Sequence, residues 1–543
     1  MRSERSFQMT TAMQTSPVYF APKSPPSIAE FFKGRSVLIT GGTGYIGKAI
    51  VEKLLHSCPG VKKLYLLVRP KKGLDPQERV KRLIEQTVFN RLRASEGHSG
   101  WQEKMVAVAG DVTADGLLGL SEEDRKELTD EVSVFFHCAA TVRFDDTLLD
   151  AVKMNVRGTL RALQLAMEMK NLKVMAHVST AYCHTERREL DEALYPPPAE
   201  WRDIIWATEN LSSFELSAIT HKIVGKLPNT YGFTKGLSEQ VVYEYRHKLP
   251  LFIYRPSIVT SAIQEPLPGW LDNFNGPVGL LIASGKGVVR TVLLNESFIA
   301  DYCPVDVCVK GVIGAAWYRA TSSKFPALTP QKEVIPEVIP EEGLKDPLLP
   351  VFNCATSGVK PVTFGEVQEM GRWLTAETPF NTILWYPGGY ATTSVFLYHI
   401  LMVLFHLIPA IIFDTGLWLT GQKTRLWRLH RRIYTANKAV KYYLLHQWKF
   451  HSKAFIELNR ELILEKDREL FALDISAIDK VEYFRNAILG GRRYLLNEPD
   501  STLPAAKANL QRMYILDRSA RLLLVALLLF FLWPHLRSLL FFV

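Results

Sequence analysis

Tyr231 and Lys235 lie four residues apart in this 543-residue chain and form the pattern Y-x-x-x-K. On a helix, two side chains at this spacing leave the same face. A neighbouring ammonium group stabilises a phenolate and lowers the tyrosine pKa from its ordinary value of about 10. Tyr231 can then donate a proton to the oxyanion that forms when hydride reaches a carbonyl carbon. The pair therefore predicts a carbonyl-reducing site.

The surroundings of this pair distinguish it from a second copy of the pattern, Tyr434 and Lys438. The second copy lies in a basic helical region without a glycine-rich turn or a strand-end hydroxyl in a matching position, so we interpret it as structural. The first copy follows the segment V-S-T by roughly fifty residues. A hydroxyl there can hydrogen-bond the carbonyl oxygen as charge develops. We favour Thr180, with Ser179 as the alternative.

A glycine-rich segment, T-G-G-T-G-Y-I-G, spans residues 40–47 between a predicted strand and a predicted helix. Glycine lets a pyrophosphate approach the helix N-terminus, where free N–H groups and the helix dipole favour anions. At this place the pattern is typical of a dinucleotide-binding turn, and a tight turn without a ligand is the alternative. We expect cofactor contacts from Gly41, Thr43, Gly44, Tyr45, Ile46 and Gly47.

The end of the second predicted strand indicates which dinucleotide is used. An NADH site places an acid there for the ribose 2′-hydroxyl. This chain instead has Arg69, followed by Lys71 and Lys72. Guanidinium and ammonium groups suit a 2′-phosphate. We therefore predict NADPH, with a solvated basic loop as the alternative.

Two further strand ends carry residues expected near the nucleotide. Asp111 and Val112 follow the third strand, where an aspartate would meet the adenine; a simple helix cap is the competing role for Asp111. Ala139 follows the fourth strand, where a small residue lets the nucleotide lie against the backbone.

The elements that position these residues form an alternating pattern. Short apolar runs are separated by helix-like stretches, which predicts βαβ units and a parallel sheet. The runs cover residues 36–40, 63–68, 105–109, 132–137, 173–178 and 251–254. The fold class predicted is α/β, a Rossmann-type doubly wound parallel sheet over residues 31–375, including substrate-binding additions. Residues 1–30 are polar and are expected to be a mobile lead-in.

Beyond residue 375 the sequence has the patterns of helices and contains long apolar segments. We expect a helical C-terminal domain over 376–500, with an apolar segment at 394–413 that is long enough to cross a bilayer. His399, His406 and Pro409 interrupt that segment, so a buried hairpin or a monotopic insertion is equally open.

Residues 521–543 predict a C-terminal transmembrane or membrane-dipping helix. Arg512 and Arg518 precede it and Arg521 begins it, which places the large N-terminal part in the cytosol.

The charge distribution also favours a membrane. The net charge is +10, and residues 423–453 hold nine Lys or Arg, several aromatic residues and no acid. This composition suits a membrane surface, with a solvated basic helix face as the alternative. We find no signature of a nucleic-acid-binding module. The six cysteines show no paired C-x-x-C spacing, so we expect no metal site.

The chain resembles the alcohol-forming fatty acyl-CoA reductases, which belong to the extended short-chain dehydrogenase class. The similarity rests on FFKGRSVLITGGTGYIGKAIVEKLL, LYLLVRPKKG, HCAATVRFDD, VSTAYC, PNTYGFTKGLSE, YRPSIV, GWLDNFNGPVG, PVDVCV and YFRNAILGGRRYLLNE. It implies a cofactor contact at Pro256 within YRPSIV. Departures occur at His184, where asparagine is frequent, and at Gly42-Thr43, where Ala-Thr is frequent; they bear on substrate fit.

The resemblance implies two hydride transfers from NADPH to a long-chain acyl-CoA, through a thiohemiacetal and an aldehyde, to a primary alcohol. It also implies a lipid bilayer as partner, at the endoplasmic reticulum or peroxisome, with the catalytic domain facing the cytosol. Self-association into a homo-oligomer stays open. The alternatives are a sterol dehydrogenase or nucleotide-sugar epimerase of the same class, and a non-catalytic dinucleotide-binding membrane scaffold.

Overall fold

The computed structural model describes residues 25–71, 73–326, 328, 338–423, 426–472 and 474–540, with side chains to residue 533. The predicted lead-in therefore falls largely outside the described residues. A seven-stranded parallel sheet has the order β11-β7-β5-β4-β1-β2-β3. Its strands are β1 (Ser36–Thr40), β2 (Lys63–Val68), β3 (Met105–Ala109), β4 (Val132–His137), β5 (Val174–Val178), β7 (Leu251–Pro256) and β11 (Val351–Cys354).

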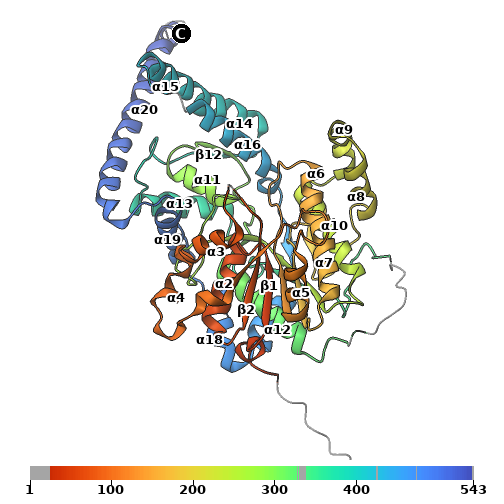
Figure 1. Cartoon of the computed structure of the whole chain (residues 1–543). Helices are drawn as coiled ribbons and strands as arrows, with labels where there is room; N and C mark the ends of the chain where they lie inside the picture. Colours follow the sequence, from red (N-terminus) through yellow and green to blue (C-terminus); the bar gives the residue numbers. More distant parts are fainter. Residues whose placement is uncertain are drawn as a thin grey trace, which may run out of the picture.

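Helices cover both faces of this sheet, which confirms the predicted doubly wound fold (Figure 1). Successive side chains of β1 point to opposite faces of the sheet: Val37 and Ile39 belong to the hydrophobic core on one face, and Leu38 belongs to the core on the other. The first core includes α2 (Tyr45–Ser57) and α12 (Val305–Thr321), and the second includes α7 (Gly158–Glu168) and α10 (Thr230–Glu244). The sheet order reverses between β1 and β4, where ligands of such folds bind.

Shorter helices and turns complete the layers around the sheet. They are α1 (Ile28–Phe32), α3 (Pro76–Ile84), α4 (Asn90–Ala94), α5 (Glu122–Glu131), α6 (Leu148–Ala151), the π-helical turn η4 (Val152–Arg157), α8 (Trp201–Asn210), α9 (Ser213–Val224), α17 (Lys453–Glu457) and α18 (Arg468–Phe471).

Three small parallel sheets connect segments that are far apart in the chain. They pair β8 (Ile258–Thr260) with β10 (Tyr302–Pro304), β9 (Thr291–Leu293) with β12 (Tyr390–Thr392), and β6 (Glu189–Leu190) with β13 (Lys449–Phe450). Beside them lie α11 (Pro277–Gly285), α13 (Phe364–Glu377) and α19 (Lys480–Gly490). These pairings bring parts of the C-terminal region against the sheet domain.

An apolar helical group lies at one end of the molecule, away from the sheet (Figure 1). α14 (Val395–Met402), a π-helical turn (Val403–Leu407) and α15 (Ile408–Leu419) form one helix, and among the described residues it is the candidate membrane span. Asp414 accepts hydrogen bonds from the first backbone N–H groups of α16 (Leu426–Leu444), which packs on α15.

Most of this apolar surface faces outward rather than into a core. Phe396 is 77% exposed and Trp418 is 70% exposed. The long helix α20 (Leu503–Leu540) exposes its apolar residues 522–533 as well. Residues 394–413 therefore do not form a buried hairpin. The end of the predicted 521–543 segment lies outside the described residues.

Candidate active site

The glycine-rich turn forms a cradle at the N-terminus of α2. Gly41 has a φ of +71°, which favours glycine, and its carbonyl accepts a hydrogen bond of 2.8 Å from Gly44 N. A Cβ on Gly41 would lie 2.8 Å from Ala139 N, and one on Gly47 would collide with the Gly41 carbonyl oxygen. The turn therefore needs glycine to pack this closely on its neighbours, and the helix N-terminus that it forms can hold a diphosphate.

Tyr231 and Lys235 lie on the first turns of α10, beside the end of β5. Asn229 caps this helix by accepting a 3.0 Å hydrogen bond from Gly232 N. Lys235 Nζ donates a 2.7 Å hydrogen bond to the Val178 carbonyl, and the side chain is buried. Lys235 is thereby fixed against β5, which is followed directly by Ser179 and Thr180.

The pKa values of the pair differ from the sequence expectation. Burial raises the pKa of Tyr231 to about 12, opposed by its side-chain hydrogen bond with Thr180. Burial lowers the pKa of Lys235 to about 8, opposed by Glu239. The expected lowering of the Tyr231 pKa by Lys235 is not found, because the ammonium is engaged by Val178 and desolvation of the phenolate outweighs other effects. A neutral phenol is nonetheless the form that a proton donor requires.

A cavity of about 570 Å³ brings most of the predicted site residues together. Its walls include Gly41, Thr43, Gly44, Tyr45, Ile46, Gly47, Ser179, Thr180, Tyr231, Lys235 and Pro256. Four predicted cofactor residues, Arg69, Asp111, Val112 and Ala139, lie outside this lining.

Arg69 and Asp111 lie together beyond the ends of β2 and β3. Their Nη1 and Oδ2 atoms are 3.6 Å apart, and the Arg69 side chain is 49% exposed. Thr113 donates two hydrogen bonds to Asp111, so a local turn-forming role for Asp111 also fits. A second guanidinium, that of Arg79, donates to the Arg69 carbonyl. Arg79 was not predicted, because it lies within α3 rather than at the end of β2. Lys72 lies outside the described residues.

The basic helix α16 contributes an aromatic side chain to the cavity wall that was not predicted from the sequence. Tyr443 lines the cavity and accepts a 3.0 Å hydrogen bond from Asn229 Nδ2. The Phe144 ring stacks on Tyr443 at 5.1 Å and lies 5.8 Å from Tyr231. The C-terminal part of the basic 423–453 region, with Tyr443, Trp448 and Phe450, therefore lines the cavity. Tyr434 of the second Y-x-x-x-K copy is 40% exposed and is not part of the cavity lining.

Asn155, on the π-helical turn before α7, was also missed. Its amide nitrogen donates a 2.9 Å hydrogen bond to Thr234 Oγ1, and its oxygen accepts one from Thr141 N. Asn155 thus ties the loop after β4 to α10. An isolated asparagine within a helical pattern gives no sequence signal of such a role.

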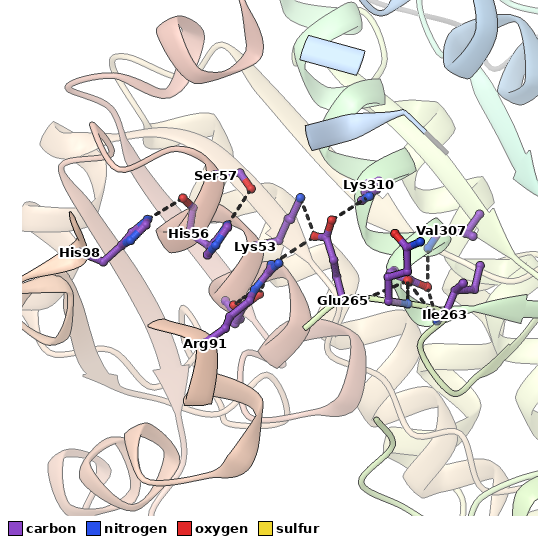
Figure 2. Close-up of polar contacts among 12 residues, drawn as sticks. Lys53, His56, Ser57, Arg91, His98, Ile263, Glu265, Val307 and Lys310 are labelled. Carbon is purple, nitrogen blue, oxygen red and sulfur yellow. Dashed lines mark hydrogen bonds and ion pairs between the residues drawn. The ribbon is translucent and has the colours of Figure 1, made fainter. Parts of the chain in front are cut away.

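A partly buried ionic network fixes the loop that carries Asp272 and Asn273 into the cavity. Figure 2 shows Lys53, Arg91 and Lys310 directed toward Glu265 on this loop. The ion pairs measure 2.6, 3.2 and 2.9 Å. Burial alone would raise the pKa of Glu265, but Lys53 and Lys310 lower it to about 2.

Asp306 supports the same loop. Its carboxylate accepts hydrogen bonds from three successive backbone N–H groups, those of residues 263–265. The loop is therefore anchored to the two helices α2 and α12 on one face of the sheet.

Cys183, His184 and Glu239 cluster closely enough to consider a metal among the described residues. Glu239, however, accepts hydrogen bonds of 2.9 and 2.5 Å from Arg255, and burial, which would raise its pKa, is outweighed by this arginine, so the pKa is lowered. A buried ion pair accounts for the cluster. His184 is one of the two positions where the sequence departs from the family pattern, and its Nδ1 lies 3.3 Å from Glu186 Oε1.

Comparison with known proteins adds independent findings. Two family models, both described as "Male sterility protein", match residues 39–312 and 405–498. The chain is 38% identical to human "Fatty acyl-CoA reductase 1" and 37% identical to that of Xenopus laevis, covering 90% and 92% of each chain. A reductase domain of a nonribosomal peptide synthetase from Mycobacterium tuberculosis superposes with a TM-score of 0.53 at 18% identity, over 87% of this chain and 93% of that one. The last match shows the fold alone.

Proposed function

Because the chain belongs to the fatty acyl-CoA reductase family, we propose that it reduces the thioester of a long-chain fatty acyl-CoA to a primary alcohol with NADPH. The observation that carries this proposal is the Tyr231–Lys235 pair, with its lysine buried, beside Thr180 in the same cavity as the glycine turn. Membership makes the protein an oxidoreductase with a nicotinamide dinucleotide; the identity of the dinucleotide and the substrate are the proposed part.

The side chains of the cavity have distinct roles in this proposal. The glycine turn and Lys235 hold the dinucleotide, which when bound supplies hydride to the carbonyl carbon. Tyr231 is protonated at neutral pH because its pKa is about 12, so it can donate its proton to the carbonyl oxygen. Thr180 hydrogen-bonds the same oxygen as negative charge develops.

Two successive reductions use this one arrangement. The first converts the thioester to a thiohemiacetal, which expels the CoA thiol and leaves an aldehyde. The second converts the aldehyde to a primary alcohol. Each requires a positioned carbonyl and one proton donor, so the same residues serve both.

NADPH is proposed over NADH because two guanidinium groups, those of Arg69 and Arg79, lie at the end of β2. Each can bind a 2′-phosphate through charge-assisted hydrogen bonds. The contact of Arg69 with Asp111 is long and exposed, so it competes weakly.

Membrane attachment is proposed through the exposed apolar helix Val395–Leu419, the basic face of α16 and the apolar end of α20. Long acyl chains and fatty alcohols partition into bilayers, so such an attachment keeps the site close to its substrate and product. We place the protein on the endoplasmic reticulum or peroxisome, with its catalytic part facing the cytosol.

The direct test is the product formed by the full chain in liposomes with NADPH and palmitoyl-CoA. We expect hexadecanol, with two NADPH consumed for each alcohol and far slower turnover with NADH. Failure to form alcohol from any acyl-CoA, together with turnover of a sterol or nucleotide sugar, would replace this function by that of the related enzymes.

A further inference from the structure

A second cavity, of about 180 Å³, adjoins the catalytic cavity. The two share four lining residues: Pro277, Tyr302, Phe364 and Leu444. Three helices of the C-terminal half of the fold surround it, namely α11, α13 and α19. The two cavities are therefore adjacent, and a chain that extends from Tyr231 into the second cavity would pass these four side chains.

The walls of the second cavity identify the chemistry of its occupant. They are mainly hydrocarbon, with Leu281, Ile282, Val367 and Ile488 among them, and none of the described lining residues is acidic. Arg290 and Arg372 also line it, but its surface is mostly apolar, so a sugar or nucleotide would lose more hydrogen bonds to water than it would regain there. An alkyl chain loses only apolar contact with water. The cavity thus fits the hydrocarbon part of a substrate.

Helix α13 runs along the cavity and presents successive turns to it. Phe364 lies at the junction with the catalytic cavity, and Val367, Gly371 and Thr375 follow along the same face. At about 1.5 Å rise per residue, Gly371 lies roughly 10 Å beyond Phe364 along the helix. Further in, Phe380 packs beside Gly285, where an added Cβ would lie 2.7 Å from the ring.

Gly371 is the position where this wall lacks a side chain. A Cβ built there meets no atom within 4 Å, so the space in front of it is open. Glycine in a helix interior is less stable than alanine. Its presence in the middle of α13 therefore has no local structural benefit, whereas it widens the cavity.

We propose that the second cavity holds the distal part of the acyl chain, and that Gly371 sets how long a chain the enzyme accepts. This inference rests on the proposed acyl-CoA reduction and assigns its chain-length selection to one position. The thioester end remains at Tyr231, and the methyl end extends along α13 past Gly371.

The test is the substitution Gly371→Leu, assayed with a series of saturated acyl-CoAs from octanoyl to octadecanoyl. We expect kcat/KM for hexadecanoyl- and octadecanoyl-CoA to fall by roughly 10–200-fold, the range for methylene groups that no longer fit an apolar pocket. The values for the shortest substrates should stay close to wild type. Leucine is a better helix former than glycine, so α13 should remain folded.

The matched control is Glu369→Leu, which adds the same side chain to an exposed position of α13 outside the cavity. It should leave the chain-length profile unchanged. An unchanged profile for Gly371→Leu, or an equal loss for every chain length, would overturn the inference while the proposed function stands. If wild type formed no alcohol from any substrate, the proposed function itself would fail.

A binding measurement keeps the cavity assignment testable without turnover. Hexadecanol with a photoreactive diazirine at its terminal carbon is cross-linked to the full wild-type chain, and the labelled peptides are mapped. Labelling within residues 277–285 and 364–377 is expected. Labelling confined to residues 395–419 would instead show an alcohol dissolved beside the apolar helix, and would contradict the assignment.

Discussion

The two Y-x-x-x-K copies share one spacing and lie in opposite surroundings. Tyr231 and Lys235 lie on α10 beside the end of β5, and Lys235 donates a hydrogen bond to the carbonyl of Val178, the last residue of that strand. Tyr434 and Lys438 lie on α16, where Tyr434 is exposed and its ring lies 6.3 Å from His399. We therefore expect catalysis only from the first copy, where a buried lysine, a hydroxyl group and the glycine turn lie together. The following experiments test that contrast.

The largest effect is expected from removing the lysine of each copy. Lys235→Met should lower kcat/KM for NADPH by about 10³-fold, since in the proposed site Lys235 holds the dinucleotide beside Tyr231. Lys438→Met should stay within about twofold, as expected for a solvent-exposed cation. Steady-state kinetics of both variants measure this contrast; similar losses in the two would contradict the assignment of one catalytic copy.

The Thr180 hydroxyl group lies beside Tyr231 of the first copy. Thr180→Val should lower kcat by about 10²–10³-fold with folding intact, because a donor to the developing oxyanion is lost. Ser179→Ala should have a smaller effect, since the hydrogen bond to Tyr231 involves Thr180. Single-turnover rates separate this effect from product release. A larger loss in Ser179→Ala would transfer the role to Ser179.

The choice between NADPH and NADH tests the basic residues at the end of β2, which belong to the domain of the first Y-x-x-x-K copy. Arg69→Asp should raise KM for NADPH by about 10²-fold and leave KM for NADH nearly unchanged, because only the 2′-phosphate contact is lost. Arg79→Ala should show a weaker change of the same sign. Identical KM values for wild type and Arg69→Asp would mean that the 2′-phosphate binds elsewhere.

The pH dependence gives the smallest effect. Lys235 is charged below its pKa of about 8 and loses its proton as the pH rises through that value, so kcat/KM for NADPH should fall by about tenfold per unit above it. Tyr231, with a pKa of about 12, stays protonated throughout. Lys438→Met should retain the wild-type profile. A profile that is flat to pH 10 would show that the free enzyme does not depend on Lys235 charge.

Local sequence patterns predicted the sheet well. Strands β1 to β4 begin and end where their apolar runs do, because a strand buried on both faces must be apolar throughout. The edge strand β11 was missed because four residues after a proline-rich stretch carry too short a pattern. The three small sheets were not predictable either, since each depends on pairing between distant segments.

The site divides in the same way. Its strand-end and helix-start residues, such as Gly41, Thr180 and Tyr231, follow from local pattern. Tyr443 and Phe380 reach the two cavities only through tertiary packing of the C-terminal helices, and no spacing in the sequence indicates this. The predicted domain boundary near residue 375 stays a prediction. β12 and β13 follow this residue in the chain but pair with β9 and β6, which precede it.

The most direct test of the account compares Tyr231→Phe with Tyr434→Phe, using palmitoyl-CoA and NADPH carrying deuterium at both C4 positions. Wild type and Tyr434→Phe should form hexadecanol with two deuterium atoms at C1, and Tyr231→Phe should form at least about 10³-fold less while still binding NADPH. Dideuterated hexadecanol formed at the wild-type rate by Tyr231→Phe would contradict the assignment of Tyr231 as the proton donor.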